Sequence, residues 1–255
     1  MRKNRQVLTV RCRQDNYAYL LPLDDGTCLL IDAPEAAPIV SRLAAEGLRL
    51  RAILLTHHHG DHVEGVEALR APGVEVIGAA ADAHRLPPLD RAVAPGEEVE
   101  VGGLSLRVLD APGHTIGHVA YHVAARSALF SGDSLMVHGC GRLFEGTPAQ
   151  MQASIAAMDR LPEDTAIFSG HDYAEANLAF AATMAPDPGA LARRHAALAL
   201  CADEGWPTTG VTLAEDRALN PYLRVHLPQV QAAVDMPGAE PVAVLAEIRR
   251  RKDRF

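Results

Sequence analysis

Long apolar runs are absent from the sequence. Hydrophobic residues make up 48% of the 255 residues, yet no stretch approaches the roughly 18 uninterrupted apolar residues that a membrane-spanning helix requires. The N-terminal stretch 1–14 is basic, but Arg11 and Arg13 interrupt any signal-peptide core. We therefore expect a globular protein of the cytoplasm.

Cysteine is scarce and scattered. None of the four forms a C-x-x-C pair: Cys12, Cys28, Cys140 and Cys201. This spacing disfavours a disulfide framework and a zinc ribbon, so we expect reduced structural thiols. The G-x-S-x-G motif of serine hydrolases is also missing, which disfavours a Ser–His–Asp mechanism.

An excess of positive charge is missing too. The formal net charge is −8, which disfavours broad binding to nucleic acid or anionic membranes. The last fifteen residues, 241–255, depart from this trend because they carry five basic and two acidic side chains, a net charge of +3.

Short strand-like and helix-like segments alternate through the first two-thirds of the chain. The expected strands are 6–12, 17–23, 27–33, 51–56, 74–80, 104–111, 118–124, 127–132 and 165–170. The expected helices are 35–47, 61–71 and 148–161. This pattern predicts a layered α/β domain with sheets inside and helices outside.

Strand signals stop near Ala174. The remaining segments are rich in Ala and Leu at helical spacing, over 174–184, 189–204, 213–220 and 241–252. We therefore predict a catalytic domain at 1–173 and an all-helical domain at 174–255.

The segment 54–62, LLTHHHGDH, concentrates four histidines and an aspartate behind a strand. Alternate side chains of a strand point the same way, so His57 and His59 should project together and His58 away. Gly60 permits a turn after which Asp61 and His62 emerge at the start of a helix. Imidazole and carboxylate groups in this arrangement suit two adjacent ions of zinc, iron or manganese better than one.

Three more candidate ligands follow glycines at the ends of strand-like runs, namely His114, Asp133 and His171. One metal would take His57, His59 and His114, and the other would take Asp61, His62 and His171. Asp133 could bridge both ions, with a solvent hydroxide in the remaining shared position. The alternative, a solvated histidine-rich loop, is disfavoured because three more candidate ligands at strand ends accompany the residues clustered in segment 54–62.

We assign the other histidines to core or surface positions: His58, His84, His118, His122, His138, His195 and His226. Of these, His138 is near enough to Asp133 in sequence to line the site.

The pattern T-H-x-H-x-D-H with later His, Asp and His resembles the signature of the metallo-β-lactamase superfamily. This resemblance implies an αββα sandwich with a two-metal site at one edge. Four further segments resemble glyoxalase II, the hydroxyacylglutathione hydrolases, most closely its bacterial branch: GDSLMVHGCGRLFEGTP, GHDYAEANLAFA, NPYLR and RRRKDRF. Together the resemblance spans nearly the whole chain.

The resemblance implies hydrolysis of S-(2-hydroxyacyl)glutathione, typically S-D-lactoylglutathione, to D-lactate and glutathione. This is the second step of methylglyoxal detoxification, and a metal-bridging hydroxide would attack the thioester. Asp61 and Asp133 would be catalytic through that hydroxide, and the two divalent ions would be zinc, with iron or manganese as alternatives. We expect a monomer that binds neither nucleic acid nor membrane.

The substrate-binding residues implied by position are Arg142, Phe144, Tyr173, Arg249 and Lys252. Some relatives have Lys-Phe-Tyr where this chain has Arg142-Leu143-Phe144. Phe144 cannot donate the phenolic hydrogen bond. The cationic C-terminal segment would suit glutathione, which carries two carboxylates.

Several alternatives stay open on the sequence. A glutathione persulfide dioxygenase with a single iron would need fewer ligands, and a β-lactamase or other hydrolase of this fold would not need the cationic tail. The acidic composition disfavours a nuclease or RNA-processing factor, and the full ligand set disfavours a non-catalytic metal-binding protein.

Overall fold

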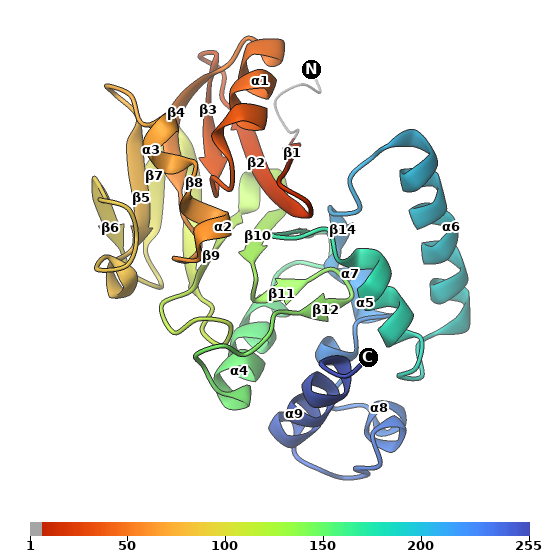
Figure 1. Ribbon diagram of the computed structural model, residues 1–255. Helices are drawn as coiled ribbons and strands as arrows, with labels where there is room; N and C mark the ends of the chain where they lie inside the picture. Colours follow the sequence, from red (N-terminus) through yellow and green to blue (C-terminus); the bar gives the residue numbers. More distant parts are fainter. Residues whose placement is uncertain (1–6) are drawn as a thin grey trace. The chain divides into compact units, whose positions relative to one another are not determined.

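The computed structural model describes residues 7–255, so Gln6 of the first expected strand lies outside the described residues. The chain divides into two compact units (Figure 1). Unit 1 runs to Asp110 and resumes over Gly117–Gly132. Unit 2 contains Ala111–Ile116 and Asp133–Phe255.

The first sheet of unit 1 follows the order of the chain. Its strands are β1 (Leu8–Cys12), β2 (Asn16–Pro22), β3 (Thr27–Ile31), β4 (Arg49–Leu54), β5 (Glu75–Ala79) and β6 (Arg91–Val93). The pairings β1–β2 and β2–β3 are antiparallel, whereas β3–β4, β4–β5 and β5–β6 are parallel. Every residue of β3 is buried, as expected for a central strand covered on both faces.

Helix α1 (Ala36–Glu46) connects β3 to β4. It ends at Gly47, whose φ of 65° is the left-handed conformation that glycine adopts at helix ends. The apolar face of α1 buries Ile39 in a cluster with Leu30 and Ile53 of the sheet. Burial of a side chain of this size contributes about 1.5–3 kcal/mol to stability.

The helix expected over 61–71 is wrong, because two short helices replace it: α2 (Gly60–Val63) and α3 (Val66–Leu69). Between them, the Gly65 N–H donates to the Ala33 carbonyl at 2.8 Å. A Cβ at Gly65 would lie 2.9 Å from that oxygen, so the backbone approaches Ala33 closely at this residue. The Gly65 N–H is used for the contact with Ala33 and does not continue the hydrogen bonding of a single helix.

A second sheet in unit 1 is antiparallel. It contains β7 (Glu98–Val101), β8 (Leu104–Asp110), β9 (Val119–Val123) and β10 (Ala128–Gly132). Gly102 and Gly103, both with positive φ, form the two-residue turn between β7 and β8. The two sheets of unit 1 face each other, because the rings of Tyr19 and Phe130 lie 5.5 Å apart and the Tyr121 hydroxyl donates to the Leu55 carbonyl at 2.9 Å.

Unit 2 begins with short strands and continues with helices. The strands are β11 (Leu135–Met136) paired with β12 (Gly139–Cys140), and β13 (Ala166–Ser169) paired with β14 (Val211–Thr212). The helices are α4 (Pro148–Met158), α5 (Ala174–Ala181), α6 (Pro188–Glu204), α7 (Leu213–Arg217), α8 (Pro228–Ala233) and α9 (Pro241–Lys252). A capping box between Thr147 and Gln150 begins α4, and α4 packs against α9.

The predicted α/β class with C-terminal helices is confirmed, although β14 interrupts the expected all-helical region. Within the described residues 7–255, no helix combines the length and apolar character needed to cross a membrane. All four cysteines are free thiols. Burial raises the pKa of Cys12 and Cys28 to about 12, so these two stay protonated.

Candidate metal centre

Unit 1 brings together the ligands predicted in segment 54–62. The segment leaves β4, turns, and enters α2 at Gly60. Ring centroids of His57 and His59 lie 4.8 Å apart, and those of His57 and His62 lie 4.2 Å apart. The potential ligand atoms of His57 lie within 4.8 Å of those of His59 and of His62, as do those of Asp61 and His62.

Asp32, at the end of β3, orients this group. Its Oδ1 accepts the Thr56 N–H at 2.8 Å, and its Oδ2 accepts the Thr56 hydroxyl at 2.8 Å and His62 Nδ1–H at 2.9 Å. Since the Thr56 hydroxyl proton points to Asp32, its oxygen accepts from His57 Nδ1, 3.0 Å away. This network assigns protonated Nδ1 atoms to His57 and His62 and leaves each Nε2 as the metal-binding nitrogen.

Asp32 and Thr56 were not among the site residues predicted from the sequence. Asp32 is buried and has a φ of 55°, a conformation that non-glycine residues other than Asn and Asp rarely adopt. An aspartate at the end of a fully buried strand was the available signal, since a buried carboxylate requires several donors.

Asp61 is held from β2. Asn16 Nδ2 donates to the Asp61 carbonyl at 3.0 Å and to its Oδ2 at 3.1 Å. The same Oδ2 lies 3.8 Å from His62 Nε2. The Asp61 side chain is about one-third exposed, so it can be reached from solvent.

Three other histidines of unit 1 were not predicted to be metal ligands. His58 Nδ1 lies 3.1 Å from Asp82 Oδ2, and Arg85 pairs with the same carboxylate at 2.5 Å. His118 is buried and stacks on His57 with ring centroids 4.7 Å apart. His122 lies within β9.

Unit 2 brings together the three other predicted ligands. His114 Nε2 lies 3.5 Å from Asp133 Oδ2, and His171 Nε2 lies 3.2 Å from the same oxygen. All three residues are buried. Two imidazole nitrogens therefore converge on one carboxylate in a site with little access to water.

The segment after β12 fixes His114. Its Nδ1 donates to the Arg142 carbonyl at 2.8 Å, and its own carbonyl accepts the N–H groups of Phe144 and Glu145 at 3.2 and 3.3 Å. A Cβ at Gly141 would lie 1.9 Å from the Asp133 carbonyl oxygen. Glycine is thus required for this segment to reach His114.

These contacts test whether the residues fit a metal ion. His114 Nδ1 must carry a proton because its partner is a carbonyl oxygen. In the neutral imidazole, Nε2 is then a lone-pair acceptor that faces the Asp133 carboxylate, another acceptor, at 3.5 Å. Two facing acceptors are stable when a cation lies between them, so the donor set fits a divalent metal.

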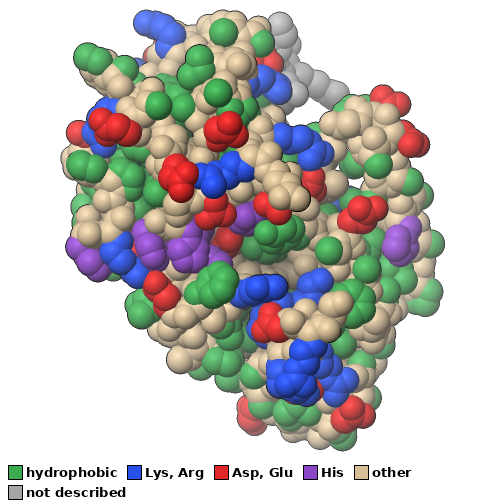
Figure 2. Space-filling model, viewed as in Figure 1, with side chains coloured by type: hydrophobic (Ala, Val, Ile, Leu, Met, Phe, Trp, Pro, Cys, Tyr) green, Lys and Arg blue, Asp and Glu red, His purple; other side chains and the backbone are tan. Residues whose placement is uncertain are grey.

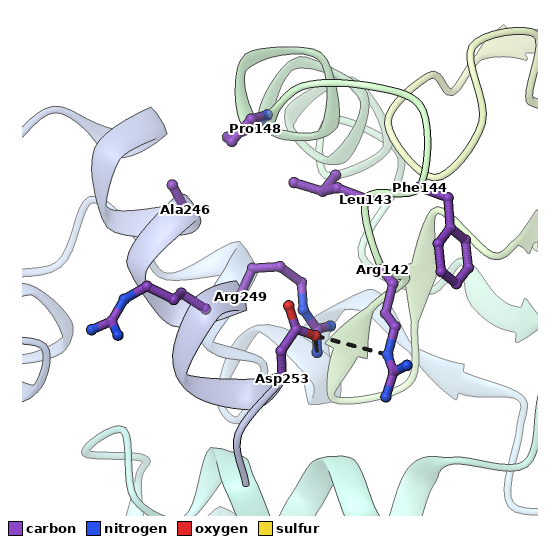
Figure 3. Close-up of a pocket in the computed structure, with 8 residues that line it drawn as sticks. Arg142, Leu143, Phe144, Pro148, Ala246, Arg249 and Asp253 are labelled. Carbon is purple, nitrogen blue, oxygen red and sulfur yellow. Dashed lines mark ion pairs between the residues drawn. The ribbon is translucent and has the colours of Figure 1, made fainter.

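The predicted substrate-binding residues lie in unit 2, as His114, Asp133 and His171 do. Arg142, Phe144 and Arg249 line a pocket of about 420 Å³ in unit 2 (Figure 3). Phe144 is largely exposed, and its ring meets that of His114 edge to face at 5.2 Å. The Tyr173 ring stacks on that of His171, with centroids 4.7 Å apart.

Lysine and arginine side chains gather over α9 (Figure 2). Lys252 Nζ donates to the Ala176 carbonyl at 2.8 Å and lies 5.4 and 5.3 Å from the ring centroids of Phe180 and Phe255. Burial, reinforced by the charges of Arg249 and Arg142, lowers the pKa of Lys252 to about 8.

His138 forms contacts of its own within unit 2. It is fully buried; its Nδ1 lies 2.7 Å from Asp216 Oδ1, and its Nε2 accepts from Arg194 at 2.7 Å.

Known proteins resemble this chain along its whole length. The family model described as "Metallo-beta-lactamase superfamily" matches residues 13–171, and the one described as "Hydroxyacylglutathione hydrolase C-terminus" matches residues 172–255. A relative named "Hydroxyacylglutathione hydrolase" from Fuscovulum blasticum is 53% identical over 251 residues, 98% of each chain. Another of that name from Jannaschia sp. (strain CCS1) is 51% identical over 252 residues, again 98% of each chain. The chain belongs to the hydroxyacylglutathione hydrolase family.

Membership of the hydroxyacylglutathione hydrolase family confirms three predictions from the sequence: the family, the metallo-β-lactamase fold with its C-terminal helical region, and a hydrolase with a metal-binding cluster of His and Asp. Among solved structures, ETHE1 from Myxococcus xanthus is similar with a TM-score of 0.65 and 25% identity. The similarity covers 97% of this chain and 98% of that one.

Proposed function

We propose that this protein hydrolyses S-(2-hydroxyacyl)glutathione thioesters, with S-D-lactoylglutathione as the typical substrate, and so completes the detoxification of methylglyoxal. The observation that carries the proposal is the full-length identity of about one-half to relatives named hydroxyacylglutathione hydrolase. The cationic pocket supports it, because glutathione carries two carboxylates that guanidinium groups bind well.

Seven residues are proposed to hold two divalent ions: His57, His59, Asp61, His62, His114, Asp133 and His171. Chain connectivity supports their assembly. Asp133 is bonded directly to Gly132, the last residue of unit 1, and His114 lies in a six-residue segment flanked on both sides by unit 1.

Two bound ions would supply Lewis acidity and lower the pKa of a coordinated water to about 7. Zinc is the proposed metal, and iron and manganese accept the same ligands. Asp61 and Asp133 are the proposed catalytic carboxylates.

The chain's own residues would then bind the substrate and orient the metal ligands. Asp32 fixes the ring orientation of His62 directly and that of His57 through the Thr56 hydroxyl. The Arg142 carbonyl fixes that of His114. The leaving thiolate is a modest base with a free-thiol pKa of about 8.5. Its departure therefore requires no dedicated general acid, and none of the side chains described above needs that role.

The proposed substrate contacts are Arg142, Phe144, Tyr173, Arg249 and Lys252. Arg142 and Lys252 provide cations for the carboxylates of glutathione. Tyr173, whose ring stacks on that of the proposed ligand His171, is proposed to contact the substrate near the metals. Phe144 offers an apolar surface in place of a phenol.

The test is thiol release from S-D-lactoylglutathione, measured with and without a chelator, together with metal content by mass spectrometry. We expect chelator-sensitive release and two ions per chain. A single iron with oxygen-dependent consumption of glutathione persulfide would favour the dioxygenase instead. Absence of thiol release from fully metallated protein would overturn the proposal.

The predicted boundary between a catalytic domain at 1–173 and a substrate-binding domain at 174–255 is part of the proposal. It is supported by the two family models, which meet between residues 171 and 172, and by the start of α5 at Ala174. The monomeric state and cytoplasmic location stay predictions, to be checked by light scattering and by cell fractionation.

A further inference from the structure

The guanidinium of Arg249 is committed to contacts within the protein. Arg249 is only 7% exposed. Its Nη1 donates to the Cys140 carbonyl at 2.8 Å, and its Nη2 pairs with Asp253 Oδ1 at 2.9 Å. Because both terminal nitrogens are engaged, Arg249 anchors its neighbours in addition to the substrate contact proposed for it above.

Asp253 connects this anchor to a second arginine. The same Oδ1 lies 3.8 Å from Nε of Arg142, whose side chain is 67% exposed (Figure 3). In the described part of the chain, Asp253 is the carboxylate that pairs with Arg142. It engages the Nε edge of that guanidinium and leaves the two terminal nitrogens, the pair that binds a carboxylate in a bidentate manner, directed away from α9.

We propose that Asp253 is a positioning residue, which holds Arg142 ready to bind a carboxylate of the glutathione moiety; this rests on the proposed function. An unrestrained arginine side chain loses rotamer entropy when it is fixed by a bound ligand. Restraining Arg142 before binding reduces that cost. Asp253 also offsets the repulsion between two neighbouring guanidinium groups.

The structure predicts that this effect is confined to binding. The Arg142 carbonyl, which orients His114, is held by the backbone, since the neighbouring Gly141 N–H donates to the Ser134 carbonyl at 3.1 Å. Loss of the Asp253 carboxylate should therefore leave His114 in place. KM should rise while kcat is preserved.

The experiment measures KM and kcat of Asp253→Asn with S-D-lactoylglutathione. We expect KM to rise about fivefold with kcat unchanged, the upper range for a partly exposed ion pair. Asp235→Asn is the matched control, because Asp235 pairs with Arg251 at 2.9 Å and the substitution removes the same charge near α9. Its KM should equal that of the wild type.

Two further arms separate positioning from a general defect. The thioester of D-lactate with N-acetylcysteamine lacks both carboxylates of glutathione, so Asp253→Asn should not change its KM. In an Arg142→Met background, Asp253→Asn should have no further effect on KM with the glutathione thioester.

An unchanged KM in Asp253→Asn would overturn the inference. A lowered KM would also overturn it, because Asp253 would then compete with the substrate carboxylate for Arg142. An equal loss with both thioesters would also overturn it. If the wild type hydrolyses neither thioester, the proposed function fails, and titration with glutathione itself decides: equal Kd values for wild type and Asp253→Asn would reject the positioning role.

Discussion

Substrate binding should weaken as pH rises through about 8, because Lys252 loses its proton there. Its ammonium is half-enclosed by Phe180 and Phe255 and lies near two arginines, so its pKa falls from 10.5 to about 8. Burial disfavours the charged form of a lysine, and neighbouring cations act in the same direction. The charged form is therefore present below about pH 8 and is lost above it.

The size of the effect follows from the titration. With a pKa of about 8, roughly nine-tenths of the lysine is charged at pH 7 and roughly one-tenth at pH 9. If only the charged form binds a glutathione carboxylate, KM for S-D-lactoylglutathione should rise about tenfold across this range. The substitution Lys252→Arg retains the charge at all these pH values. The KM of Lys252→Arg should therefore not show this tenfold rise between pH 7 and 9.

The assay is the KM profile of wild type and Lys252→Arg between pH 7 and 9. The substrate's own amino group titrates nearby, but it affects both proteins equally, so their ratio isolates Lys252. If KM depended on pH equally in wild type and Lys252→Arg, the role of the Lys252 charge in substrate binding would be refuted. The free energy of unfolding gives a second measurement: the unfolded state binds more protons between about pH 8 and 10.5, so wild type should gain stability over that window and Lys252→Arg should not.

Four other substitutions, with one control, test the proposed metal centre and substrate contacts. Asp133→Ala should lose both bound metal, measured by mass spectrometry, and thioesterase activity, measured by thiol release. The control Asp203→Ala, at an exposed position of α6, should lose neither. Asp32→Asn should weaken metal affinity about 10- to 100-fold in a chelator competition, since Asp32 orients ligands without being one; unchanged affinity would argue against that role. Phe144→Tyr should lower KM about two- to fivefold at constant kcat if the added hydroxyl meets the substrate, and no change would remove this position from the contact surface. Gly141→Ala should reduce activity even if circular dichroism shows a folded protein, because a Cβ would collide with the Asp133 carbonyl.

Strand β3 and helix α1 were predicted well from the sequence. The strand expected over 27–33 is observed at Thr27–Ile31, and the helix expected over 35–47 at Ala36–Glu46 with Gly47 as its C-cap. In both segments the local pattern and the tertiary environment favour the same structure.

Very short elements escaped prediction. Strand β6 has three residues, and β11 and β12 have two each, too few for an alternating pattern to be recognised. The break between α2 and α3 depends on the approach of Gly65 to the Ala33 carbonyl. No property of the residues near Gly65 indicates that contact.

The two groups of predicted ligands differ in how much of their geometry is local. His57, His59, Asp61 and His62 belong to one strand–turn–helix segment, so period-two alternation and a turn at Gly60 suffice to gather them. His114, Asp133 and His171 come from separate segments. Their convergence could be inferred only from their shared position at strand ends.

The groups that orient the ligands also differ between the two units. In unit 1 the orienting groups are the side chains of Asp32 and Thr56, which a substitution can remove. In unit 2 the group is the main-chain carbonyl of Arg142, which has no signature in the sequence and survives any change of side chain. Arg142→Met should therefore raise KM and retain full metal content, whereas Asp32→Asn should reduce metal content. If Arg142→Met lost metal, the orientation of His114 would depend on the Arg142 side chain, and the separation between substrate binding and metal binding argued for this protein would be wrong.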